Sequence, residues 1–141
     1  MRAPSRVLTG LVFLVAATFC GCGMSKGVDQ AKKAVDEFHT RFNAKQFDAI
    51  FDAADPEWKK TTDRDTSDKF FGRVQRKMGT CTTSTSGGYN YNVTTSGTFV
   101  TIDYETICAN GKLAEEFRWR VDGQRVLLLA YNANNPLLLT D

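Results

Sequence analysis

The stretch TFVTIDYETICANGKLAEEFRWRVDGQRVLLLAYN, residues 98–132, decides the fold of this chain. Apolar and polar residues alternate along it, as they do in strands that bury one face. Two dipeptides, Asn110-Gly111 and Asp122-Gly123, interrupt the alternation. Both tolerate the positive φ angles of a two-residue type I′ turn, so the stretch predicts two β-hairpins that share their middle strand.

The two turns also predict which residues pair. A two-residue turn at 110–111 pairs Ala109 with Lys112, and one at 122–123 pairs Val121 with Gln124. Both registers give the same buried face, which a slip of one residue would turn toward solvent. The residues predicted on that face are Val100, Ile102, Tyr104, Thr106, Cys108, Leu113, Glu115, Phe117, Trp119, Val121, Val126, Leu128 and Ala130.

The opposite face of these strands is mixed. It carries charged residues together with an apolar stripe of Leu127, Leu129 and Tyr131. Either a partner covers this stripe, as a second copy of the chain or another envelope protein would, or the aliphatic stems of neighbouring arginines do. The stripe is a candidate interface, and both interpretations stay open.

Three amphipathic helices are predicted before the sheet. Apolar residues at helical spacing mark the first from Val28 to Phe42 and a second, shorter one from Phe47 to Ala54. The third begins near residues 65–67 and ends at Gly79, a residue type that commonly follows a helix. Amphipathic helices need a surface on which to bury their apolar face, and the predicted sheet provides it.

Residues 80–97 are rich in serine, threonine, tyrosine and glycine. A low-complexity loop is one interpretation. The alternation of Tyr89, Tyr91 and Val93 with asparagines favours a strand that pairs back on residues 100–104, with a bend at Gly87-Gly88. The chain therefore predicts an α+β fold, in which N-terminal helices pack on a curved antiparallel sheet in a single domain over residues 28–141.

The N-terminus has the pattern of a bacterial export signal. Arg2 and Arg6 precede a nearly continuous apolar run over residues 7–19, and small residues follow it. This run is shorter than the ~20 apolar residues that a membrane span needs. We therefore expect residues 1–21 to be a signal peptide that is removed.

The end of this run, Phe19-Cys20-Gly21-Cys22, resembles the lipobox of bacterial lipoproteins. The resemblance implies that Cys22, rather than Cys20, is acylated once the signal is cut, so that acyl chains anchor the protein in a membrane. It also implies that Gly23 directs the protein to the outer membrane, where it faces the periplasm. Residues 22–27 are then expected to form a flexible tether.

Cys81 and Cys108 are the two cysteines left for the domain itself. In an oxidising compartment they are expected to form a disulfide. The simple register places Thr85 opposite Cys108, so the bond requires the bend at Gly87-Gly88 to shift the strand.

The charge balance excludes one class of partner. The chain has 18 basic and 16 acidic residues, and the signal peptide takes two of the basic ones, which leaves 18 − 2 = 16 of each sign. A balanced domain has no electrostatic footprint for nucleic acid. One histidine and no clustered cysteines give no metal site, and no motif implies a cofactor.

The order of elements and the hairpin Phe117-Arg118-Trp119-Arg120-Val121-Asp122-Gly123 resemble the nuclear-transport-factor-2-like, or cystatin-like, family over residues 28–132. The resemblance implies a cone-like sheet curved around the long first helix. It often implies a cavity as well, which in some members of the family binds a ligand or catalyses an isomerisation. Other members dimerise through the open face of the sheet.

A carboxylate among aromatic side chains is the candidate centre of such a cavity, because this environment suits proton transfer. His39 lies about 70° from the centre of the first helix's stripe at ~100° per residue, which favours a boundary residue over a catalyst. The candidate pocket residues are His39, Tyr89, Tyr91, Tyr104, Glu115 and Trp119.

The sequence predicts a lipid-anchored envelope protein that is not an enzyme. Its domain is expected to bind a small apolar ligand or another envelope protein. The alternative is a small isomerase-like or hydrolase-like enzyme with its cavity around Glu115.

Overall fold

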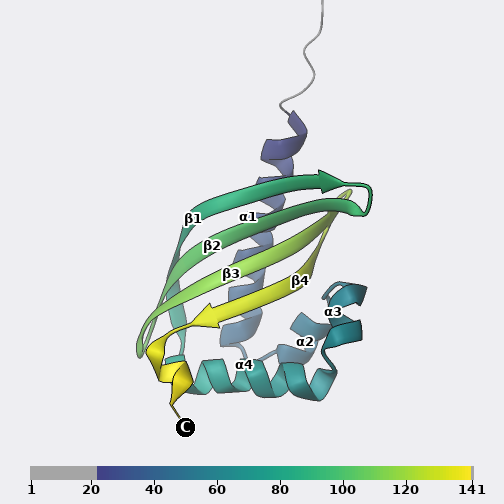
Figure 1. The fold of residues 1–141 in the computed structure, drawn as a ribbon. Coiled ribbons are helices and arrows are strands. Elements are labelled where there is room, and N and C mark those ends of the chain that lie inside the picture. Colours follow the sequence, from purple (N-terminus) through teal and green to yellow (C-terminus); the bar gives the residue numbers. More distant parts are fainter. Residues whose placement is uncertain (1–21, 141) are drawn as a thin grey trace, which may run out of the picture.

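The computed structural model describes residues 22–140, and the predicted signal peptide lies outside this part. The predicted α+β architecture is confirmed, with helices packed on an antiparallel sheet of strand order β1-β2-β3-β4 (Figure 1). No described helix has both the length and the apolar character needed to cross a bilayer. The elements are α1 (Cys22–Asn43), α2 (Phe47–Asp52), α3 (Pro56–Thr61), α4 (Arg64–Met78), β1 (Cys81–Thr94), β2 (Gly97–Cys108), β3 (Gly111–Asp122), β4 (Arg125–Asn134) and the 3-10 helix η1 (Pro136–Leu139).

The first helix is longer than predicted. Residues 22–27, expected to be a flexible tether, are the first turns of α1. A Cβ at Gly27 would lie 3.0 Å from the ring of Tyr91, so this glycine lets β1 pack directly on the helix. That contact gives the early turns tertiary support, which short helical segments need in water.

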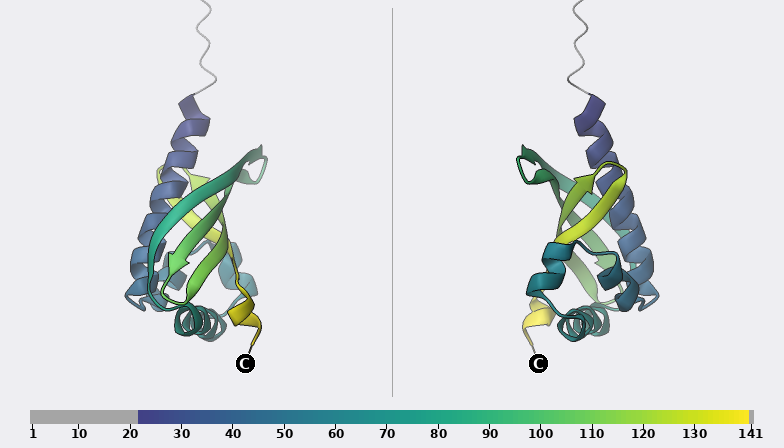
Figure 2. Two further views of the ribbon diagram at one scale, coloured as in Figure 1. Left: turned by 90° about the vertical axis from the view of Figure 1, so that its left-hand side faces the viewer. Right: turned by 90° about the vertical axis from the view of Figure 1, so that its right-hand side faces the viewer.

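The core lies between the inner face of the sheet, α1 along one side and α4 across one end (Figure 2). Phe38 on α1 is its centre, with ring centroids 5.0 Å from Phe117 and 4.9 Å from Tyr131. Phe117 and Trp119 are both buried, as their predicted positions on the inner face require.

One helix was not predicted. Residues after Asp55-Pro56 form α3, because the Asp55 carboxylate accepts the backbone N–H of Glu57 and proline suits the first helical turn. The other oxygen of this buried carboxylate accepts the Arg120 Nε–H at 2.7 Å, and the backbone N–H of Asp55 donates to the carbonyl of Leu128. Asp55 thereby joins α3 to both β3 and β4.

The predicted register of the first hairpin is wrong by two residues. Cys108 pairs with Gly111, so that Ala109 and Asn110 form the turn in place of Asn110 and Gly111. The turn is fixed from outside the hairpin, since the backbone N–H groups of Ala109 and Asn110 donate to the carbonyls of Thr80 and Met78. A shift of two keeps every side chain on its predicted face, and the buried face of β2 and β3 is therefore confirmed.

The second hairpin is also shifted, and it contains a bulge. Asp122 pairs with Arg125, so the turn is Gly123 and Gln124. The register then slips at Leu129, between the pair of Trp119 with Leu128 and the pair of Arg118 with Ala130. The bulge reverses the faces beyond it, so Ala130 leaves the predicted buried face and Tyr131 enters the core beside Phe117.

The disulfide between Cys81 and Cys108 is confirmed. The strand register shifts between Ser86 and Tyr89, at the predicted glycine bend, and again after Cys81. Thr94 pairs with Gly97, so the β1–β2 turn moves the pairing by two residues from the simple register, and the two irregularities move it by two more, which brings Cys81 opposite Cys108. The bond therefore joins the start of β1 to the end of β2.

Candidate functional site

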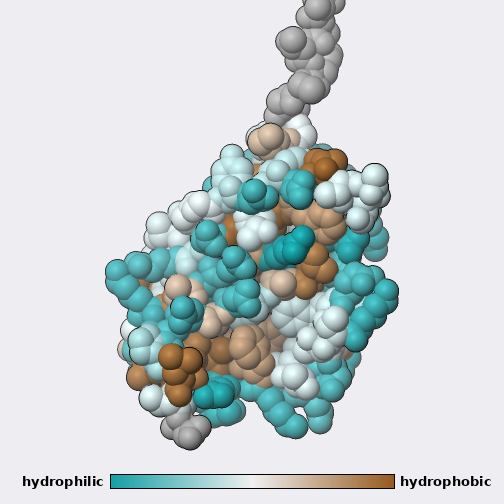
Figure 3. Space-filling model, viewed as in Figure 1, coloured by the Kyte–Doolittle hydropathy of each residue, from teal (hydrophilic) through white to brown (hydrophobic). Residues whose placement is uncertain are grey.

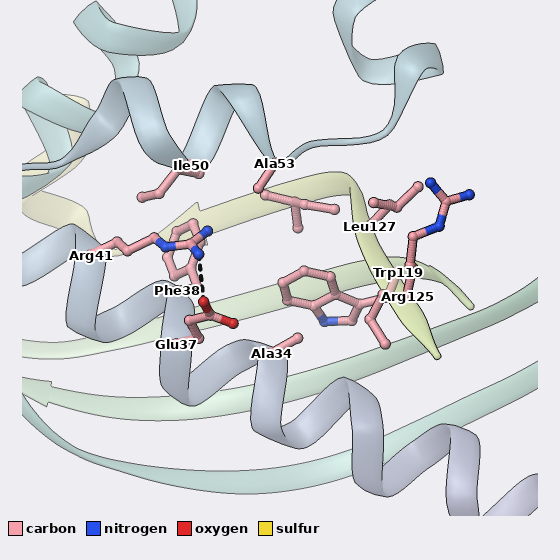
Figure 4. Close-up of a pocket in the computed structure, with 11 residues that line it drawn as sticks. Ala34, Glu37, Phe38, Arg41, Ile50, Ala53, Trp119, Arg125 and Leu127 are labelled. Carbon is pink, nitrogen blue, oxygen red and sulfur yellow. Dashed lines mark hydrogen bonds and ion pairs between the residues drawn. The ribbon is translucent and has the colours of Figure 1, made fainter. Parts of the chain in front are cut away.

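A cleft of about 280 Å³ opens between α1, α2, β3 and β4 (Figure 4). Its interior is mainly aliphatic and aromatic, and charged side chains stand at its mouth. The helices and strands around it are part of the core, so the cleft is held by packed elements. We call it the cleft, and its lining residues are Ala34, Glu37, Phe38, Arg41, Ile50, Ala53, Trp119, Arg125, Val126, Leu127 and Leu128.

Trp119 forms one wall of the cleft. Its ring stacks on Phe117 with centroids 5.9 Å apart, which fixes its orientation. Figure 4 shows the edge that carries the indole nitrogen directed toward Ala34. This nitrogen is buried and has no hydrogen-bond partner among the described residues. A buried donor without an acceptor costs roughly 1–3 kcal/mol.

The mouth of the cleft carries both signs of charge. Glu37 and Arg41, one turn apart on α1, form an ion pair beside the opening (Figure 4). Arg125 stands on the β4 side and pairs with Asp122. Both arginines already have carboxylate partners, so neither is a dedicated anion site.

Of the predicted pocket residues, only Trp119 lines the cleft. Tyr89 is exposed, and Tyr91 packs on α1 at Gly27. Tyr104 lies against Phe117 in the core, with ring centroids 5.9 Å apart. Tyr104 also pairs with Glu115 across β2 and β3, and its ring lies edge-on to His39 with centroids 6.4 Å apart. The structure therefore brings Tyr104, His39 and Glu115 together, and it places Tyr89 on the surface and Tyr91 against α1.

His39 and Glu115 come together elsewhere, inside a buried cluster that we call the polar network. Glu115 is 4% exposed, and its Oε2 lies 2.8 Å from His39 Nε2 and also accepts a hydrogen bond from Thr106. Its Oε1 accepts the Tyr131 hydroxyl at 2.7 Å. Every carboxylate oxygen has a partner, which is the condition under which a buried charge is tolerated.

The polar network reaches the surface through Ser84. Its Oγ lies 3.2 Å from His39 Nδ1 and 2.9 Å from Thr106 Oγ1. His39 and Ser84 line a groove of about 240 Å³ together with five polar or sulfur-bearing residues, which are Asp36, Thr40, Asn43, Cys81 and Thr82. The groove and the cleft share no residue, so the two openings are separate.

Burial raises the pKa of Tyr131 well above 10.0, and the charge of the neighbouring Glu115 adds to this effect. The pKa of Tyr104 is also raised, first by burial and then by Asp36 and Glu115. The Tyr131 hydroxyl therefore keeps its proton and remains a donor to Glu115.

Sequence reasoning missed the role of Tyr131, because the bulge at Leu129 has no glycine to mark it. His39 was expected at a boundary, and it does lie at the edge of the α1 stripe, with its ring against Phe38 and Phe117. The signal that could have placed it was Glu115 itself, since a carboxylate on a buried face requires donors.

The predicted interface stripe is not continuous. Tyr131 is buried in the core and Leu127 lines the cleft, so Leu129 alone does not make a stripe. On the same outer face, the guanidinium groups of Arg118 and Arg120 lie 5.3 and 5.2 Å from the centre of the Phe99 ring.

Within residues 22–140, no group of three or more His, Cys, Asp or Glu side chains is placed to hold a metal ion. Neither the protein-family models nor the curated proteins compared with this chain match it.

Proposed function

We propose that this protein binds a small, mostly apolar ligand in the cleft and is anchored to the outer membrane by acyl chains on Cys22. The observation that carries the binding proposal is the aromatic and aliphatic interior of the cleft around Trp119. Ligand sites are commonly concave, mostly apolar and equipped with few polar groups. The resemblance to the nuclear-transport-factor-2-like family, in which a sheet curved around the first helix often leaves a cavity, also supports a binding site.

The size of the cleft limits the ligand. A volume of about 280 Å³ corresponds to on the order of nine liquid water molecules at ~30 Å³ each. Phe38, Trp119 and Leu128 line the cleft, so a ligand with a mostly apolar surface would fit it best.

Binding can be tested with the apolar dye 1-N-phenylnaphthylamine. Ala53 is exposed at the edge of the cleft, so Ala53→Trp is expected to fill the opening without disturbing the core. Dye affinity should fall about tenfold, which corresponds to ~1.4 kcal/mol. Leu139→Trp, at an exposed position far from the cleft, is the matched control. Equal dye binding by both variants would contradict the proposal.

The location rests on other observations. The disulfide favours an oxidising compartment such as the periplasm. Acylation at Cys22 follows from the resemblance of residues 19–22 to a lipobox. Cys22→Ser should move the protein from the membrane fraction to the soluble envelope fraction. Retention of this variant on the membrane would contradict the anchor.

A second candidate function is hydrolysis in the groove. Ser84, His39 and Glu115 are connected in the order nucleophile, base and orienting carboxylate. Wild-type protein should then react with a fluorophosphonate probe, and Ser84→Ala should not. Thr82 lines the same groove, so Thr82→Ala is the control and should still react with the probe. An unlabelled wild-type protein would exclude this candidate.

A further inference from the structure

One end of the molecule differs from the rest of its surface. The first turns of α1 and the turns of the β1–β2 and β3–β4 hairpins point toward this end, and α4 with η1 lies at the other end (Figures 1 and 2). We call the exposed part of this end the N-terminal surface, and its members are Met24, Lys26, Tyr89 and Val93.

The N-terminal surface exposes large apolar side chains. Met24, Tyr89 and Val93 are 49%, 55% and 65% exposed. Tyr89 and Val93 flank Tyr91 on the inner face of β1, and Tyr91 touches α1 at Gly27. Met24 lies one turn before Gly27 and on the same side of the helix. Figure 3 shows hydrophobic surface near the start of α1 and over the end of β1.

This region also lacks charge where a solvent-exposed strand usually carries it. Residues 81–102, which include the whole of β1, contain no Asp, Glu, Lys, Arg or His. β1 is an edge strand of the sheet, and edge strands in water are commonly protected by charged side chains. Tyrosine, which β1 carries at two positions, is enriched at membrane–water interfaces because its ring is apolar and its hydroxyl is polar.

The charge that is present lies on the neighbouring helix and is basic. Residues 22–33 contain Lys26, Lys32 and Lys33 against Asp29, a net charge of 3 − 1 = +2. Lys26 and Lys33 border one surface depression beside Gln124 of the β3–β4 turn. Basic side chains near a bilayer are attracted to anionic headgroups by about 1 kcal/mol each.

The length of the helix brings this end within reach of a bilayer. Gly27 lies five residues beyond Cys22, which is an axial rise of about 7.5 Å. The headgroup layer of one leaflet is roughly 5–8 Å thick, from the difference between the whole bilayer and its hydrocarbon core. If the acyl chains hold Cys22 at the boundary of the hydrocarbon core, this rise places Gly27, and Tyr91 packed against it, at the outer edge of the headgroup layer.

We propose that the N-terminal surface lies against the headgroup layer of an anionic bilayer, with Met24, Tyr89 and Val93 in contact with lipid. The domain then has one orientation, in which α4 and η1 point away from the membrane. This inference rests on the proposed anchor at Cys22. It goes beyond anchoring, because a tether alone would leave the domain free to tumble.

The test uses a fluorescent residue at the surface and one at the opposite end. The chain from Cys22 onward contains the whole described core, and Cys81 and Cys108 are bonded to each other, so the Cys22 thiol can be coupled to a maleimide phospholipid. Vesicles of phosphatidylethanolamine and phosphatidylglycerol carry this lipid and a phospholipid brominated near the headgroup. The tryptophan fluorescence of Val93→Trp is compared with that of Leu139→Trp. The emission of Trp58 and Trp119, measured in the protein without either substitution, is subtracted from both.

Val93→Trp emission should shift to the blue and lose about half its intensity, because interfacial groups lie ~5–10 Å into the headgroup boundary. Leu139→Trp emission should not change. Equal quenching of both variants, or of neither, overturns the proposal. So does a blue shift of Val93→Trp without vesicles that grows with protein concentration, since a second copy would then cover the surface.

This coupling supplies the anchor chemically, so its outcome does not depend on natural acylation. A mass spectrum of the protein isolated from its envelope tests that acylation separately. The protein from the envelope could lack acyl chains while the coupled protein still shows the Val93→Trp response. That result would contradict acylation at Cys22 and would support contact of the N-terminal surface with lipid.

Discussion

The polar network and the cleft differ in how their buried polar groups are satisfied. In the polar network, both oxygens of Glu115 and both ring nitrogens of His39 have partners in the protein. In the cleft, the indole N–H of Trp119 has no partner among the described residues, and open volume lies beside the ring. The polar network is complete without a ligand, whereas the cleft has open volume beside an aromatic wall.

This difference predicts that the polar network contributes to the stability of the fold and that the cleft contributes to ligand binding. Changes in the polar network should cost folding free energy, because they leave charged or polar groups buried without partners. Changes at the cleft should cost little stability and should alter ligand binding. The following variants test that separation, beginning with the largest expected loss of stability.

Glu115→Ala should destabilise the protein by about 3–5 kcal/mol, since it leaves His39, Thr106 and Tyr131 buried without their common acceptor. Urea unfolding followed by circular dichroism measures the loss. Glu116→Ala, at the exposed neighbouring position, should stay within roughly 0.5 kcal/mol. Equal losses for the two variants would mean that the network does not support the fold.

The double variant Cys81→Ser with Cys108→Ser removes the covalent link beside the groove. For a sequence separation of 27 residues, the chain-entropy model gives about 3–4 kcal/mol of lost stability. Reduction of the wild-type protein should lower its urea midpoint to the same value as in the double variant. A midpoint that does not respond to reduction would contradict the bond.

Tyr131→Phe removes one hydrogen bond to a carboxylate and should cost roughly 1.5–3 kcal/mol. The raised pKa of Tyr131 adds a pH test. Above pH 10.0 the unfolded chain loses this proton and the folded protein keeps it, so stability falls as pH rises, by ~1.4 kcal/mol per unit.

Tyr131→Phe should reduce that alkaline slope, measured as the unfolding free energy between neutral and strongly alkaline pH. Tyr89→Phe, on an exposed side chain, is the control for the loss of a hydroxyl. If both variants keep the full slope, then Tyr131 is not the group that stabilises the fold through its proton.

Leu127→Ala shortens a half-buried wall of the cleft and should cost less than ~1.5 kcal/mol. Leu113→Ala, at a fully buried position, should cost about 2–5 kcal/mol. Thermal unfolding of both variants measures the difference. A larger loss for Leu127→Ala would show that the cleft wall belongs to the packed core.

The sequence predicted the fold class and the buried face of β2 and β3 because alternation has a period of two. Both turns were misplaced by one residue, a change that shifts pairing by two and preserves the face. The turn at 109–110 is bound to Thr80 and Met78, and such long-range hydrogen bonds have no local sequence signal. The fold class was therefore more predictable than the pairing register of the strands.

The candidate site was less predictable. Glu115, His39 and Trp119 were named, but as members of one pocket, and the structure places the first two in the network and the third in the cleft. The bulge at Leu129 moved Tyr131 from the predicted interface to Glu115. Ser84 was not named, because a serine in an uncharged strand is indistinguishable from its neighbours until the strand is paired.

Native mass spectrometry of the protein purified from its own envelope tests ligand binding in the cleft most directly. The wild-type protein should carry an additional mass that dissociates on gentle activation. The Ala53→Trp variant should lose this mass, and Leu139→Trp should keep it. A wild-type protein that shows only the mass of its own chain and acyl groups would contradict the proposed function.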